Sequence, residues 1–180
     1  MRTAVTLGDR GKGGLPVTFG VSGHIGEEQC DFAGIPVTGD VRRHTWSLNA
    51  DIRIPITERL GFQGEFFTGE NLGAFLGGIG QGVNPLTLNS IHSTGGWLEL
   101  WYDWTPRLHS HFGYGIDDPN DSDLTAVGSR AYNQFYFGNV VYDITKSFIA
   151  GVEVSSWRTL YVGQLPGDSV RCEFVMKYGF

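Results

Sequence analysis

The chain ends in VRCEFVMKYGF (residues 170–180), and within this stretch hydrophobic and polar side chains alternate up to the last residue. The apolar side chains occupy every second position: Val170, Cys172, Phe174, Met176, Tyr178 and Phe180. An alternation of period two is the pattern of a β-strand with one apolar face and one polar face. The stretch therefore predicts a strand that continues to the last residue, although chain ends are usually polar and poorly ordered.

The same alternation recurs along the whole chain, while helical periodicity is nearly absent. We predict strands at 15–26, 44–55, 60–69, 95–104, 108–116, 130–143, 147–160 and 169–180. In the strand at 130–143, Phe135 and Phe137 fall on the polar parity, so we expect a bulge or a partly apolar inner face there. The sequence predicts an all-β fold, an antiparallel up-and-down meander of about eight strands.

The connections between these strands alternate between short and long. The short ones place a threonine directly after a strand, at Thr57, Thr105 and Thr145. The long ones are rich in Gly, Asp and Pro and cover roughly 27–43, 70–94 and 117–129. In an antiparallel meander this order puts the tight turns at one end and the long loops at the other. The last strand should finish at the tight-turn end.

Composition excludes several classes of protein. The net charge of −6 argues against nucleic-acid binding, which requires a basic face. No stretch of 18 apolar residues is present, so a transmembrane helix is not expected. The first residues carry no apolar core of signal-peptide length, so we expect an exported protein with this sequence to be a mature chain or a fragment. The cysteines, Cys30 and Cys172, fit no metal-site spacing, and we expect no disulfide between them.

An up-and-down meander of this size suits two architectures. A soluble barrel of the lipocalin type carries its apolar face inside, whereas a membrane barrel turns that face toward lipid. The length of the predicted strands fits a bilayer. The aromatic residues of the apolar parity also gather near the strand ends in two bands, as at membrane interfaces. One band comprises Phe62, Trp104, Tyr142, Phe148, Tyr178 and Phe180, and the other Trp46, Phe66, Tyr114 and Tyr132. These features favour a transmembrane β-barrel.

The end of the chain resembles the C-terminal signature of Gram-negative outer-membrane β-barrels, with Tyr178 third from the end and a terminal Phe180. The resemblance covers the whole chain in architecture, but only about the last ten residues as a motif, and it indicates no particular porin subfamily. It implies location in the outer membrane and recognition by the barrel-assembly machinery through Phe174, Met176, Tyr178 and Phe180.

Charged and histidine side chains on the polar parity would face the lumen of such a barrel. The expected pore-lining residues are Asp51, Arg53, Glu65, Glu99, Asp103, His109, His111, Glu153, Arg171 and Glu173. In a wide barrel they would tune the passage of solutes, and in a narrow one they would fill the interior as ion pairs. We therefore expect a porin-like channel for passive diffusion of small hydrophilic solutes. The alternatives are a small closed barrel with a structural or adhesive role, or a barrel enzyme.

The first residues suggest a single β-barrel domain (1–180) that is the C-terminal portion of a larger barrel. RTAVTL (2–7) has the pattern of a strand but is too short to span a membrane. The expected partners are membrane lipid, the assembly machinery and small hydrophilic solutes. Both a single chain and a homo-oligomer are compatible with the sequence.

Three polar motifs invite other functions. The HSH at 109–111 could bind a metal, but no third ligand is evident, and lumen-facing histidines are favoured. DDPNDSD (117–123) lacks the glycine and distal glutamate of an EF-hand and is expected to be an acidic outer loop. GGIGQG (77–82) opens no helix and does not predict a phosphate site. We expect no catalytic residues, metal or cofactor.

Overall fold

The computed structural model describes residues 1–8, 14–30 and 41–179, which form one sheet of nine strands. The strands are β1 (Arg2–Leu7), β2 (Val17–Cys30), β3 (Val41–Pro55), β4 (Leu60–Glu70), β5 (His92–Thr105), β6 (Leu108–Pro119), β7 (Arg130–Asp143), β8 (Phe148–Tyr161) and β9 (Gly167–Tyr178). Three short 3₁₀ turns complete the described structure: η2 (Gly73–Phe75), η3 (Gly78–Gly80) and η4 (Asp121–Asp123). No helix in these residues has the length and apolar character needed to cross a membrane.

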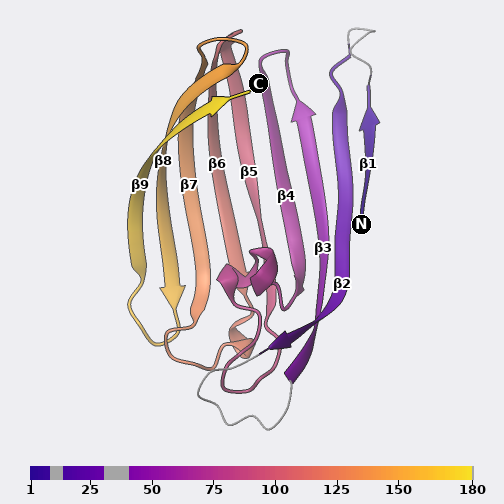
Figure 1. Cartoon of the computed structure of the whole chain (residues 1–180), viewed down its shortest axis with the longest axis vertical. Coiled ribbons are helices and arrows are strands. Elements are labelled where there is room, and N and C mark those ends of the chain that lie inside the picture. Colours follow the sequence, from indigo (N-terminus) through magenta and orange to yellow (C-terminus); the bar gives the residue numbers. More distant parts are fainter. Residues whose placement is uncertain (9–13, 31–40, 180) are drawn as a thin grey trace.

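Every strand pairs antiparallel with its neighbours in the chain, in the order β1 to β9 (Figure 1). The predicted all-β meander is confirmed. The stretch at 2–7 adds a ninth strand, with Arg2 opposite Ser22 and Leu7 opposite Val17. β1 and β9 form the two edges of the sheet, and no pairing joins them among the described residues.

Several strands extend beyond their predicted bounds at the long-loop end of the sheet, where β3 begins at Val41 and β5 at His92. β2 continues to Cys30 and β6 to Pro119, so the predicted loops at 27–43 and 117–129 begin too early. The alternation of apolar and polar residues fades in both extensions, but backbone pairing continues without it. In β2, Glu27 faces His44 and Cys30 faces Val41. Residues 31–40 of the first predicted loop lie outside the described residues.

The recurring threonines close the tight turns. The Thr57 hydroxyl accepts hydrogen bonds from the backbone N–H groups of Arg59 and Leu60, at 3.1 and 2.9 Å. Thr105 repeats this arrangement toward the next strand pair, at 3.2 and 3.0 Å. Thr145 accepts one such bond from Ser147 at 3.2 Å. A hydroxyl that bonds its own turn in this way stabilises the reversal of the chain.

The strand register sorts the side chains onto two faces. Cross-strand neighbours lie on the same face, so each row of partners can be followed across the sheet. One apolar row contains Ile52, Gly64, Leu98, Tyr114 and Tyr136. The adjacent row on the opposite face contains Arg53, Gln63, Glu99, Gly113, Phe137, Ser155 and Arg171. The apolar face has almost no buried side chains, since most of its large residues are exposed.

The polar face is the concave one. The sheet is curved, and the connection between β4 and β5 folds back over its concave side (Figure 1). This connection contacts the polar face, where Phe75 stacks on His24 of β2 and Ile79 bonds Asp117 of β6. A lipocalin-type barrel would place the apolar face inside. The structure has the inverse arrangement, which does not fit the lipocalin-type architecture.

The strand pairing also differs from that of a closed barrel of eight strands. In such a barrel the strand at 15–26 would pair with the last strand. Here β2 is already paired on both edges, with β3 from Thr18 to Cys30 and with β1 from Val17 to Ser22. Cys30 and Cys172 are not joined by a disulfide in the structure.

Candidate functional site

The candidate site is the concave face together with the connection 71–91, which we call the inward loop. It is fixed at points far apart on the sheet. On the β2 side, the rings of Phe75 and His24 stack with centroids 4.1 Å apart. On the opposite side, the Gln81 side chain exchanges two hydrogen bonds with the backbone of Arg130 in β7, at 2.8 and 2.9 Å. The loop therefore spans the concave face from β2 to β7.

Asp117 holds the centre of the inward loop against β6. Its carboxylate accepts hydrogen bonds from the backbone N–H of Ile79 at 2.8 Å and from the Ser93 hydroxyl at 2.6 Å. The sequence placed Asp117 in an acidic, solvated outer loop. That prediction is wrong because Asp117 belongs to β6 and continues the inward parity of Gly113 and Gly115.

The base of the inward loop holds several of the buried side chains of the described structure. Asn71, Leu72, Asn84 and Ile91 are each almost completely buried. Asn84 bonds the backbone of Asp123 and the Thr125 hydroxyl of the next long connection, at 2.6 and 2.8 Å. Buried amides with directed hydrogen bonds specify one conformation. The loop is thus a packed unit of the structure.

The backbone of the inward loop is strained. All the non-glycine residues with positive φ in the described chain lie in it: Asn71, Leu76, Ile79 and Leu88. A left-handed conformation is costly for branched side chains and persists only where surrounding contacts enforce it. At Leu76 this conformation accompanies a side chain that is 93% exposed. The loop therefore carries an exposed apolar side chain on a polar face.

A narrow gap separates the inward loop from the wall formed by β2 to β4. Its volume is about 240 Å³. The wall contributes His24, Ser47, Asn49, Glu65 and Phe67, and the loop contributes Leu72, Phe75, Leu76 and Gly77. His24 is fixed by Ser47 and Thr45, with ring nitrogens 2.8 and 3.0 Å from the two hydroxyls. Apart from Phe67, the wall side of the gap is polar, whereas the loop side is apolar.

All the side chains expected to line a pore lie on the concave face, on the same side of the sheet as the inward loop. Several are joined in short networks. The His109 ring bridges three strands, with nitrogens 2.7 Å from Asp103 and 3.4 Å from Asp143. Glu99 accepts from Gln63 at 2.8 Å and lies 2.9 Å from His111.

The remaining wall residues are less connected to one another. Arg2 forms an ion pair with Asp51 at 2.7 Å, and Asn139 donates to Glu153 at 3.0 Å. Arg53 donates to Gln63. Glu65, Arg171 and Glu173 share the concave face without belonging to these networks. No group of three or more metal-binding side chains occurs in the described part of the chain. His109 and His111 each contact carboxylates of neighbouring strands.

Aromatic rings on the concave face lie over glycines of the next strand. A Cβ atom at Gly113 would lie 2.2 Å from the Phe137 ring, and one at Gly115 would lie 2.3 Å from the Phe135 ring. Glycine is therefore required where these rings cover the backbone. This packing explains the apolar residues on the polar parity of β7, where a partly apolar inner face was expected. A register shift between Arg130 and Tyr132, at the start of β7, does not change the face on which Phe135 and Phe137 lie.

Two arginines stack on tryptophans of the same wall. The Arg53 guanidinium lies 4.1 Å from the centre of the Trp101 ring, whose other side covers Gly61. The Arg171 guanidinium lies 4.8 Å from the Trp157 ring, which in turn stacks on Phe135 at 4.3 Å. Such stacking orients a guanidinium and leaves its N–H edge available. The sequence named both arginines but gave no sign of the rings beneath them, because that pairing depends on the register.

The residues of the expected assembly signal lie on the outward face of β9. Phe174, Met176 and Tyr178 point away from the concave face, and Phe174 is 82% exposed. β9 pairs only with β8 among the described strands. Its end is held at the tight-turn end by a 2.8 Å bond from the N–H of Gly179 to the carbonyl of Ser147. Phe180 lies outside the described residues.

No family model and no curated protein matches the sequence. The fold is similar to the crystal structure of the outer membrane channel DcaP of Acinetobacter baumannii, with a TM-score of 0.69 and 14% sequence identity. The match covers 99% of this chain and 51% of that channel, so the chain spans about half the length of the protein it resembles. At this identity the similarity shows the fold alone, an antiparallel meander of β-strands like part of that channel.

Proposed function

We propose that this chain forms part of the wall of an outer-membrane, porin-like channel for passive diffusion of small hydrophilic solutes. The inward loop would narrow the pore. The observation that carries the proposal is the position of this loop, fixed across a polar concave wall from His24 to Arg130. A loop packed against one side of a wet lumen reduces the open cross-section there and sets which solutes pass. The similarity to a channel supports this function.

In this proposal the sheet is the C-terminal portion of a larger barrel, and the apolar face contacts lipid. The unpaired edges of β1 and β9 in the described sheet favour closure by further strands, because open edges do not persist in a membrane. The exposed outward face of β9 supports recognition by the barrel-assembly machinery. The proposal involves no catalytic step.

Channel activity can be tested in planar lipid bilayers with the full-length protein. We expect stepwise, ohmic conductance increases, and swelling of proteoliposomes in small neutral sugars with a cut-off at larger ones. Folded protein should show heat-modifiable mobility on gels, and this supplies the control for insertion. Folded, inserted protein without conductance would contradict a diffusion channel and would favour a barrel with a structural or adhesive role.

The lipid contact of the outward face predicts an asymmetry between two arginine substitutions. Leu100→Arg places a charge on the outward face near the middle of β5 and should destabilise the barrel by roughly 2–4 kcal/mol. Val141→Arg places the same charge on the concave face in the row of Asp103 and His109, where it should cost little. Urea unfolding in lipid vesicles measures both free energies. Equal costs for the two variants would mean that the outward face does not contact hydrocarbon.

A further inference from the structure

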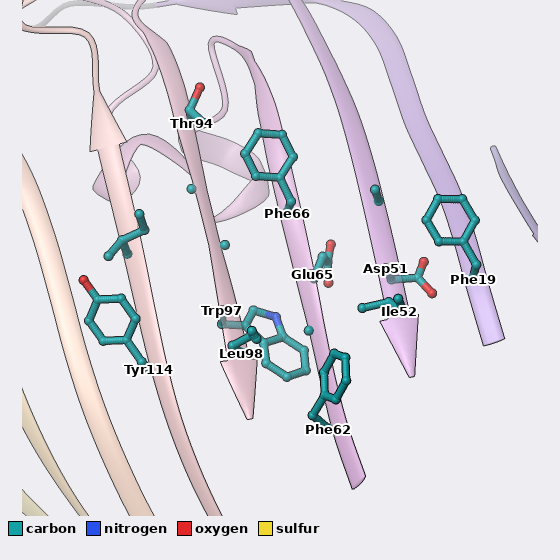
Figure 2. Close-up of a pocket in the computed structure, with 15 residues that line it drawn as sticks. Phe19, Asp51, Ile52, Phe62, Glu65, Phe66, Thr94, Trp97, Leu98 and Tyr114 are labelled. Atoms are coloured by element: carbon teal, nitrogen blue, oxygen red, sulfur yellow. The ribbon is translucent and has the colours of Figure 1, made fainter. Parts of the chain in front are cut away.

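The outward face carries a hollow that the channel function does not use. It lies across β2 to β6 and has a volume of about 450 Å³. Phe62, Phe66, Leu98 and Tyr114 project around it (Figure 2). Its outward-facing lining is completed by Phe19, Ala50, Ile52, Gly64, Thr94, Gly96 and Ile116. The inward loop and the solute path lie on the other side of the sheet.

The hollow is built into the strands through its small residues. Gly64 and Gly96 lie in adjacent rows of β4 and β5, and Ala50 faces Phe66 in the row of Gly96. A Cβ atom at Gly64 would lie 2.6 Å from the carbonyl oxygen of Trp97, and one at Gly96 would lie 2.3 Å from that of Glu65. These contacts are too short for any side chain. The floor of the hollow therefore stays without a side chain at Gly64 and Gly96.

The chemistry of the hollow selects an occupant without hydrogen-bonding groups. The polar atoms at its rim are already engaged, with Thr94 bonded to Thr68 at 3.0 Å and Tyr114 bonded to Tyr132 at 3.3 Å. A polypeptide segment laid into the hollow would leave its N–H and C=O groups without partners, which is costly in an apolar site. Hydrocarbon carries no such cost.

We propose that this hollow holds one acyl chain of a membrane lipid in a fixed position. The inference rests on the proposed membrane function, because only an inserted barrel presents this face to lipid. The hollow extends from Phe62 of one aromatic band to Phe66 and Tyr114 of the other, so it covers the outward face between the bands, where the hydrocarbon chains lie. An empty hollow of this size forfeits the dispersion contacts of its lining. A chain that enters it recovers those contacts, since packing is the main source of attraction within a bilayer.

The proposal is tested by filling the hollow from its floor. Ala50→Trp should occupy the space, while Ala150→Trp makes the same change on the outward face of β8, outside the hollow. The probe is phosphatidylethanolamine with a photoreactive diazirine in the middle of one acyl chain, in vesicles containing the full-length protein. Cross-linked peptides are quantified by mass spectrometry, with the outward face of β9 as the reference.

We expect preferential labelling of the β4 and β5 peptides over the β9 peptide in the unmodified protein. Ala50→Trp should reduce that labelling about fivefold, because a filled site has no room for the chain. Ala150→Trp should leave the labelling unchanged. Equal labelling of β5 and β9 would overturn the proposal, and so would an unchanged pattern in Ala50→Trp.

A second copy of the protein is the competing occupant, and it gives a different result. The β4 and β5 peptides would then be protected from the probe, and Ala50→Trp would dissociate an oligomer on native gels. Heat-modifiable mobility and bilayer conductance are measured on the same samples. If the unmodified protein shows neither heat-modifiable mobility nor conductance, the proposed channel function is wrong. If it conducts but all its outward peptides are labelled equally, only the acyl-chain site is wrong.

Discussion

Removing the inward loop is expected to raise the single-channel conductance several-fold. Replacing residues 72–90 by a Gly-Gly turn would join β4 to β5 by a short hairpin. The variant loses the contact with His24, the bond to Asp117 and the bonds to Arg130, which together hold the loop across the lumen. Conductance rises with open cross-section, so a pore without this obstruction should pass more current and admit larger sugars. Recordings in planar bilayers and swelling of proteoliposomes measure the two effects.

The matched control alters a connection that does not contact the inward loop. Leu165 lies in the turn between β8 and β9 at the same end of the sheet and is exposed. Leu165→Ala should leave the conductance unchanged. Heat-modifiable mobility shows whether each variant is folded. If the variant without the loop folds and conducts like the parent, the narrowest part of the pore lies elsewhere and the role proposed for the loop is wrong.

The alternation of side chains allowed the strands and their faces to be predicted from the sequence. Period two is a local property, and it placed Glu99 and Leu100 on opposite faces without knowledge of their neighbours. The threonines at 57, 105 and 145 were equally informative, because a turn that bonds its own hydroxyl is also local. Together these patterns gave the order of tight turns and long loops, and hence the meander.

The inward loop could not be predicted, because its position depends on contacts between distant residues. Ile79 meets Asp117 and Gln81 meets Arg130 only after the strands have taken their register. Its left-handed residues, such as Leu76 and Ile79, have side chains that give no local sign of that conformation. The assignment of Asp117 to an outer loop failed for a related reason. The apolar–polar alternation ends at Asp117, while the backbone pairing of β6 with β5 continues to Pro119.

The aromatic residues of the concave face show where parity alone is insufficient. Phe135 and Phe137 conflict with a polar lumen when β7 is considered by itself. The conflict disappears when β7 is aligned with β6, because their partners across the strand pair are Gly115 and Gly113. A ring that lies over a glycine covers the exposed backbone of the neighbouring strand. The pairing of aromatic residues with glycines is therefore visible only when the sequences of β6 and β7 are aligned in their correct register.

Replacing the outward aromatic residues of β9 is expected to cause the largest loss of folded protein in the membrane. Phe174 and Tyr178 occupy the exposed, apolar side of an edge strand whose second edge has no partner in the described structure. Such a strand can be bound through its backbone, while the outward side chains give specificity. The double substitution Phe174→Ala and Tyr178→Ala should therefore lower assembly several-fold in cells, as should removal of Phe180. Val175→Ala, on the concave side of the same strand, is the matched control and should assemble normally.

Refolding in vitro separates recognition from stability in these variants. The purified double variant, refolded from urea into detergent without any assembly machinery, should reach nearly the same folded fraction as the parent, because neither ring is buried in the sheet. The folded fraction in both settings is measured by heat-modifiable mobility. A variant that folds poorly in detergent as well would show that these rings stabilise the barrel itself. A variant that assembles normally in cells would show that the outward face of β9 is not the assembly signal.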